Sequence, residues 1–145
     1  MPRRFVDTNI IIYAAGGEHP LKASCVAVLR WVAQGTWEGV TSAEVLQELL
    51  YLMDRRNQRD VGIAMAREVL AIMTVLPVTA ADVQQAMTFM EGVPALMPYD
   101  ALHAAVMQGA GITEIISADK HFDAVPGIRR LDPAALRAAG TEDGA

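Results

Sequence analysis

Short apolar, β-branched segments alternate along this chain with longer segments of helical periodicity, and this alternation restricts the fold more than any other feature. Strands are predicted at residues 4–7, 37–40, 74–78, 114–117 and 127–131. Helices are predicted at 20–33, 41–57 and from residues 60, 79, 98 and 133 onward, because apolar residues recur there at helical spacing. The alternation predicts a three-layer α/β/α fold with a mainly parallel sheet of about five strands.

Several predicted elements carry a specific expectation about burial. The segment 74–78 is apolar and β-branched, so we expect a buried strand. The helix from Asp60 is expected to face inward with one set of residues: Ala64, Met65, Val69 and Ile72. In the helix capped by Thr79, another set is aligned: Val83, Ala86, Met87 and Met90. Trp31 and Trp37 are read as core residues or as part of a groove for a partner.

Length and composition indicate one folded domain. The chain has 145 residues, of which 52% are hydrophobic. We expect a single domain over residues 1–140 and a flexible tail over 141–145. No apolar run approaches the roughly 18 residues of a membrane span, and no leader segment is recognisable, so no membrane association is expected. Cys25 is the only cysteine and lies on an apolar helix face, so we expect a core residue and a reducing, cytoplasmic setting.

Four carboxylates stand out by position. Asp7 ends the first predicted strand, Glu48 lies beside the apolar stripe of its helix, Asp100 begins a helix, and Asp119 follows a strand. Each alone has an ordinary structural explanation as a turn former, helix cap or surface acid. In a parallel sheet, however, acids at strand ends far apart in sequence converge on one edge.

A cluster of this kind predicts divalent-cation chemistry. Packed carboxylates repel one another and take up protons unless cations are present, and hard cations prefer oxygen ligands. The formal net charge of −5 argues against a broad basic surface for nucleic acid but is compatible with a nuclease, because bound cations would meet phosphate instead. No nucleophilic triad is recognisable. The three histidines, His19, His103 and His121, are too scattered in sequence to predict a zinc site.

Four motifs together resemble the PIN-domain family, and most closely its VapC class of toxin ribonucleases. They are VDTN at 6–9, SAEVLQEL at 42–49, YDALHAA at 99–105 and ISADKHF at 116–122. The resemblance covers residues 5–123 in the family's order. It implies a metal-dependent endoribonuclease that uses Mg²⁺ or Mn²⁺, acts as the toxin of a toxin–antitoxin pair, forms a homodimer and is blocked by a small antitoxin.

The resemblance also implies roles for individual residues. The metal ligands and catalytic acids are expected at Asp7, Glu48, Asp100 and Asp119. The supporting residues are Thr8 and Ser117, which orient the acids, Asn9, which lines the site, and Asp123, which assists directly or through water. Glu44 competes with Glu48, which is preferred because it directly precedes a leucine pair. Four cations are read as contacts to the RNA backbone or as solvated surface charge: Lys120, Arg55, Arg56 and Arg59.

Three other functions remain to be weighed. A phosphatase of the haloacid dehalogenase type needs a second acid two residues after the first, where this chain has Asn9. A phosphate-accepting receiver domain needs paired acids at the first strand end, where Thr8 follows Asp7. The third is a catalytically silent PIN-like domain that binds RNA or protein. The target RNA and the number of metal ions stay open.

Overall fold

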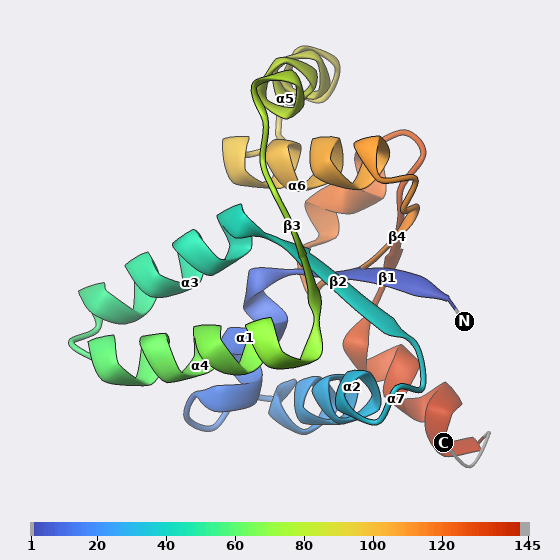
Figure 1. Ribbon diagram of the computed structural model, residues 1–145. Helices are drawn as coiled ribbons and strands as arrows, with labels where there is room; N and C mark the ends of the chain where they lie inside the picture. Colours follow the sequence, from blue (N-terminus) through green and yellow to red (C-terminus); the bar gives the residue numbers. More distant parts are fainter. Residues whose placement is uncertain (1, 143–145) are drawn as a thin grey trace.

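Five short strands form one sheet in the computed structural model, which describes residues 2–142 (Figure 1). All neighbouring strands run parallel, in the order β3-β2-β1-β4-β5. The strands are β1 (Arg3–Val6), β2 (Glu38–Ser42), β3 (Thr74–Leu76), β4 (Glu114–Ile116) and β5 (Arg129–Leu131). The predicted α/β fold with a parallel sheet is therefore confirmed.

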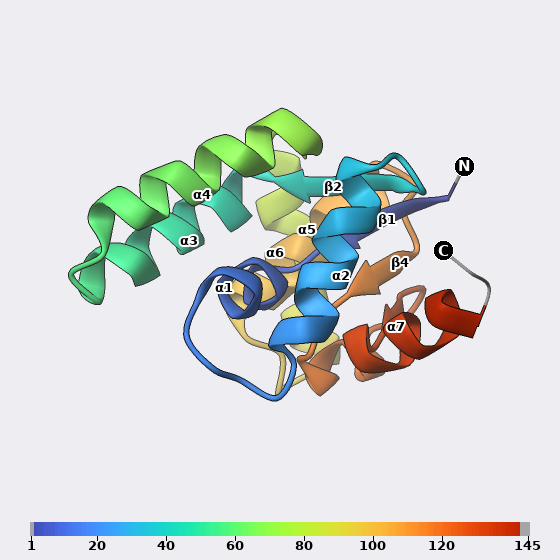
Figure 2. The ribbon, with the colours of Figure 1, turned by 90° about the horizontal axis from the view of Figure 1, so that it is seen from below.

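Helices cover both faces of this sheet. They are α1 (Thr8–Ala15), α2 (Lys22–Ala33), α3 (Ala43–Arg55), α4 (Arg59–Ile72), α5 (Ala80–Gly92), α6 (Pro98–Gly109), α7 (Pro133–Glu142) and the short 3₁₀ helix η1 (Lys120–Ala124). Helices α1, α2 and α7 lie on one side, and α5 and α6 on the other (Figures 1 and 2). Helices α3 and α4 pack together and project as a hairpin beyond the sheet. The arrangement has the three layers that the sequence predicts.

Local sequence signals explain where several helices begin. The Ser42 hydroxyl accepts a hydrogen bond from the Val45 amide at 3.3 Å and caps α3. Thr79 and Asp82 form a reciprocal capping box at the start of α5. Pro98 occupies the first turn of α6, where its missing amide hydrogen costs no helical bond. No helix within residues 2–142 has the length and apolar character needed to cross a membrane.

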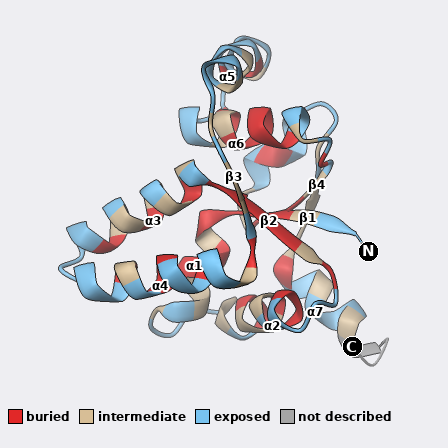
Figure 3. Ribbon diagram, in the orientation of Figure 1, coloured by how far each residue is buried: buried red, intermediate tan, exposed pale blue. Residues whose placement is uncertain are grey.

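The core lies around the three central strands (Figure 3). The side chains of Phe5, Val40 and Ile115, one from each of these strands, are fully buried. Trp31 and Trp37 are also buried, as expected of core residues. Cys25 is fully buried, as expected from its apolar helix face.

Three predictions about burial differ from the structure. Strand β3 is half-buried or exposed, not buried, because it is an edge strand that pairs only with β2. Helix α4 buries Ala66 in place of the predicted Ala64, which is exposed. Helix α5 buries Ala86 of its predicted set and leaves Val83, Met87 and Met90 exposed. Residues 141 and 142 of the expected tail belong to α7, and residues 143–145 lie outside the described part of the chain.

Strand order places a crevice beside Asp7. The chain proceeds from β1 outward to β2 and β3 on one side, and β4 and β5 occupy the other side. In parallel sheets, the point where the order reverses leaves a crevice at the carboxyl ends of the strands. Val6 and Ile116 are register partners across β1 and β4. The next residues along each strand, Asp7 and Ser117, therefore emerge side by side at this crevice.

Candidate active site

Asp7 is fixed by hydrogen bonds at both carboxylate oxygens. It is the N-cap of α1, and its Oδ1 accepts from the Thr8 amide at 2.7 Å. Its Oδ2 accepts from the Ser117 hydroxyl at 2.6 Å and from Asn9 Nδ2 at 3.2 Å. Asp7 is only 4% exposed. The strand-to-helix turn thus holds a buried carboxylate in one orientation.

Asn9 and Ser117 link the ends of β1 and β4. The Asn9 side chain accepts from the Ala118 amide at 3.3 Å and donates to Ser117 Oγ at 3.3 Å. Ser117 Oγ in turn accepts from the Asp119 amide at 2.9 Å. Two neutral side chains therefore set the separation of two acids, Asp7 and Asp119, that are far apart in sequence.

Glu48 enters the site from the first half of α3. Its Oε2 accepts a hydrogen bond from the Thr8 hydroxyl at 2.9 Å. The helix begins directly after β2, so its first turns start at the same edge of the sheet as Asp7. Of the two candidate glutamates on α3, Glu48 accepts the hydrogen bond from Thr8, whereas no such bond is seen for Glu44, one turn earlier.

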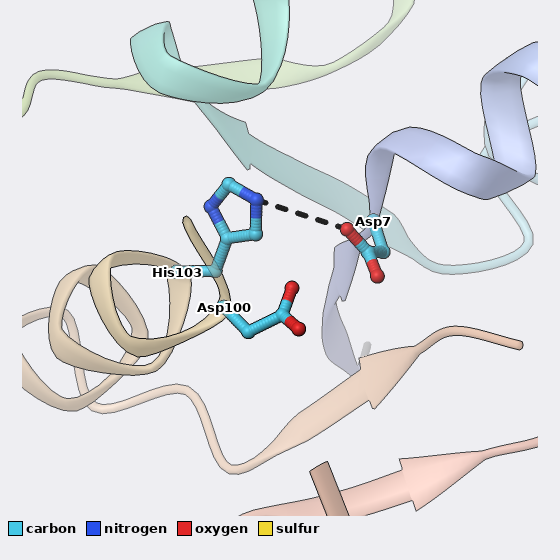
Figure 4. Close-up of side chains that lie close together, drawn as sticks. All are labelled: Asp7, Asp100 and His103. Atoms are coloured by element: carbon cyan, nitrogen blue, oxygen red, sulfur yellow. Dashed lines mark ion pairs between the residues drawn. The ribbon is translucent and has the colours of Figure 1, made fainter. Parts of the chain in front are cut away.

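Helix α6 contributes Asp100 and His103, which lie one turn apart (Figure 4). The His103 ring is fully buried, and its Nε2 lies 3.8 Å from Asp7 Oδ1 and 3.4 Å from Glu48 Oε2. His103 was not predicted as a site residue, because the three histidines lie far apart in the sequence and form no common motif. The signal was its spacing of three from Asp100, which places both on one helix face.

Asp119 completes the cluster from the segment after β4. It caps η1 by accepting from the His121 amide at 2.9 Å, and His121 Nδ1 lies 3.1 Å from its carboxylate. Among the described residues, two groups have ligand atoms within 4.8 Å of one another: Asp7 with Asp100 and His103, and Asp100 with Asp119 and His121. Asp100 belongs to both groups, so Asp7, Asp100 and Asp119 form one connected cluster of acids.

Burial and mutual repulsion perturb the acids. Burial raises the pKa of Asp7 above its ordinary value, against the opposing pull of His103 and the Ser117 hydrogen bond. Burial, the hydrogen bond with Asp119 and the charge of Asp7 together raise the pKa of Asp100 to about 8. Burial also acts to raise the pKa of Asp119, but hydrogen bonds from Asp100 and His121 outweigh it and lower that pKa. Of these two acids, Asp100 is therefore the one whose protonated form is favoured when no cation is bound.

The donor set fits a divalent metal ion. Three carboxylates converge from separate segments, one of them buried, and at least one retains a proton near neutral pH. A bound divalent cation would lower the pKa of these carboxyl groups and displace that proton, because it stabilises the ionised form of each carboxylate. The cluster is thus an acidic site suited to bind a divalent metal.

The other residues predicted for the site, Asp123 and the four cations, lie outside the acid cluster. Asp123 faces Arg130, which donates to it from Nε at 2.9 Å and from Nη2 at 3.3 Å. Lys120 is exposed next to Asp119. The three arginines predicted to contact RNA, Arg55, Arg56 and Arg59, lie at the tip of the α3–α4 hairpin. There Arg59 pairs with Asp54 at 2.7 Å and Arg55 contacts Tyr51. Arg55 is seven residues beyond Glu48, about 10 Å along the helix axis.

The family model for the PIN domain matches residues 4–128 of this chain. Among named proteins, the chain is 35% identical to ribonuclease VapC13 of Mycobacterium tuberculosis over 127 residues, which cover 87% of this chain and 97% of that protein. It is 39% identical to ribonuclease VapC23 of the same organism over 122 residues, covering 82% and 91% of the two chains.

Solved structures of similar proteins show the same fold. The crystal structure of VapC20 from Mycobacterium tuberculosis, described as a sarcin–ricin loop cleaving toxin, superimposes with a TM-score of 0.70 at 26% identity and covers 83% of this chain and 92% of that one. VapBC2 from Rickettsia felis, solved bound to a DNA fragment from its promoter, superimposes with a TM-score of 0.71 at 16% identity and covers 90% and 99%.

Proposed function

The chain belongs to the PIN-domain family, and on that premise we propose that it is a metal-dependent endoribonuclease of the VapC class, the toxin of a toxin–antitoxin pair. It hydrolyses phosphodiester bonds of RNA. The observation that carries the proposal is the cluster in which Asp100 lies close to both Asp7 and Asp119, three acids from distant segments of the chain. Named ribonucleases at 35–39% identity over most of the chain support the same activity.

The proposed metal ligands are Asp7, Asp100 and Asp119, with Glu48 binding directly or through water. When bound there, a divalent cation lowers the pKa of water and offsets the charge that builds on the phosphate. The carboxylates hold that ion, and Mg²⁺ or Mn²⁺ is the proposed metal because oxygen donors dominate the set.

The surrounding side chains keep these acids in place. Thr8 orients Glu48, while Asn9 and Ser117 fix Asp7 relative to Asp119. Asp123 is proposed to assist indirectly, because its partner Arg130 also donates from Nη1 to the Ser117 carbonyl at 3.0 Å. Because these contacts are already formed without substrate, the acids need not reorient when an anionic phosphate binds.

Substrate RNA is proposed to approach over the exposed edge that carries Lys120. This side chain directly follows Asp119, so its ammonium group can meet the phosphate next to the bond that is cut. The three hairpin arginines, Arg55, Arg56 and Arg59, remain a prediction for contacts farther along the RNA. The proposed setting is the cytoplasm, where RNA targets are present.

Exposed apolar side chains support the proposal that this chain binds protein partners. Tyr51, Val61 and Leu70 are 51%, 45% and 56% exposed on the α3–α4 hairpin. Patches of this kind on a small domain mark surfaces that associate. The structural neighbours include VapBC complexes from Rickettsia felis and Salmonella typhimurium. We therefore propose a small antitoxin and a homodimer as partners of this chain.

The test is RNA cleavage by wild type and two matched variants. Wild type should cleave RNA with Mg²⁺ or Mn²⁺ and should stop when EDTA is added. Asp7→Asn should lose more than about a hundredfold in cleavage rate while its circular dichroism stays unchanged. Asp60→Asn, an exposed acid at the start of α4, should cleave like wild type. Cleavage that persists in EDTA and in Asp7→Asn would refute the proposal.

A further inference from the structure

His103 is a buried side chain whose polar atoms lack hydrogen-bond partners. Among the side chains that the structure describes, those of residues 2–140, its Nδ1 and Nε2 are the only buried nitrogen or oxygen atoms with no hydrogen bond. A buried polar group left unsatisfied costs about 1–3 kcal/mol, and such exceptions in folded proteins call for an explanation. A hydrophobic residue of similar size would avoid the cost, so the imidazole indicates a ligand that the polypeptide itself does not supply.

The ring is aimed at the acid cluster. Figure 4 shows the imidazole from α6 facing Asp7, on the same side of the helix as Asp100. Its Nε2 lies 3.8 Å from Asp7 Oδ1 and 3.4 Å from Glu48 Oε2, too far or too poorly aligned for a hydrogen bond. Two ligands of an octahedral ion with bonds of about 2.1 Å lie about 3.0 Å apart when adjacent and about 4.2 Å apart when opposite. The separations therefore match two ligands of one ion better than a donor and its acceptor.

We propose that His103 provides a nitrogen ligand, through Nε2, to the cation held by the acid cluster. The proposal rests on the proposed function and extends its set of ligands. Imidazole binds first-row transition metals far better than Mg²⁺, whereas carboxylates serve both. A site with one imidazole among carboxylates therefore prefers Mn²⁺ and later transition metals to Mg²⁺, and His103 sets that preference.

The direct test is the electron spin-echo envelope modulation of bound Mn²⁺, measured on tag-free protein. Wild type should show coupling of Mn²⁺ to one nitrogen, and labelling histidine with ¹⁵N should change that coupling. The signal should disappear in His103→Leu and His103→Gln and persist in His121→Gln and His19→Gln. A signal that survives in the His103 variants, or that is lost only in His121→Gln, would overturn the assignment.

Calorimetry separates ligation from simple positioning. Mn²⁺ affinity should fall on the order of tenfold in both His103 variants, while Mg²⁺ affinity falls much less. The amide of His103→Gln can restore a hydrogen bond to Glu48 but is a poor replacement for an imidazole ligand. If His103→Gln keeps the wild-type ratio of Mn²⁺ to Mg²⁺ affinity, His103 only positions Glu48 and the proposal is wrong.

The two proposals fail in different ways. Wild-type protein that binds no divalent cation and cleaves no RNA would defeat the proposed function and this inference together. Wild-type protein that binds Mn²⁺ and cleaves RNA, but shows no nitrogen coupling, would defeat the inference alone. The labelled wild type gives this answer even if His103→Leu fails to fold.

Discussion

Asp100→Asn should stabilise the metal-free protein at pH 8 and reduce its stabilisation by divalent cations. Burial, the hydrogen bond with Asp119 and the charge of Asp7 raise the pKa of Asp100 from 3.8 to about 8. Because the folded value lies above the unfolded one, ionisation of Asp100 costs stability. The cost is absent below about pH 3.8, grows as the pH rises, and is complete above about pH 8. An asparagine keeps a donor for Asp119 and cannot ionise.

The size of this effect follows from the pKa. One unit corresponds to about 1.4 kcal/mol, so a rise of about four units sets a ceiling of about 6 kcal/mol. The lowered pKa of Asp119 offsets part of the stability that ionisation of Asp100 costs, because the stabilising contribution of Asp119 is present above pH 3.8. We expect a net gain of about 2–3 kcal/mol at pH 8 for Asp100→Asn, which raises Tm by roughly 5–10 °C in a chain of this size.

Thermal melts in EDTA and in MgCl₂ measure both parts of the prediction. In EDTA, the Tm of wild type should fall between about pH 5 and pH 8 more steeply than that of Asp100→Asn, and the two should converge at the acidic end. Mg²⁺ at ten times its Kd should stabilise wild type by about 1.4 kcal/mol and the variant far less. Asp60→Asn should follow wild type throughout. A lower Tm of Asp100→Asn than of wild type at pH 8 in EDTA would refute the reasoning.

Other predictions concern packing, thiol chemistry and RNA contact. Gly62→Ala should lower the free energy of unfolding in urea by about 1–3 kcal/mol, because the added Cβ meets Met53 Cβ at 2.7 Å. Gly92→Ala, with open space around it, should change it by no more than about 0.5 kcal/mol. Burial raises the pKa of the Cys25 thiol to about 11, so a thiol reagent at pH 8 should modify unfolded protein and spare the folded state. Lys120→Ala should weaken RNA binding and reduce its salt slope by about one, as measured by fluorescence titration; an unchanged slope would remove Lys120 from the phosphate contact.

The parts of the fold that local sequence determines were predictable. Ser42, Thr79 and Pro98 mark helix starts through contacts within a few residues, and a short apolar strand followed by Asp7 indicates a turn whatever the rest of the chain does. The meeting of Asp7 and Asp119 followed from a general property of parallel sheets, whose carboxyl ends share one edge.

Features that depend on neighbours in space were not predictable in the same way. Whether β3 is buried depends on its place at the edge of the sheet, which its own apolar sequence does not encode. Helix α5 buries Ala86 and Phe89 and leaves Met87 exposed, because its phase is set by packing against α6. His103 appears in the sequence as one of three unrelated histidines, and only the fold brings its ring against Phe5 of β1 and close to Asp7.

Anomalous diffraction from crystals soaked in Mn²⁺ tests the proposed metal centre most directly. We predict a manganese peak within bonding distance of the Asp7, Asp100 and Asp119 carboxylates in wild type and no such peak in Asp7→Asn. A fully occupied Mn²⁺ elsewhere on the molecule, with the three carboxylates empty at saturating metal, would contradict the proposal that this cluster is the catalytic site.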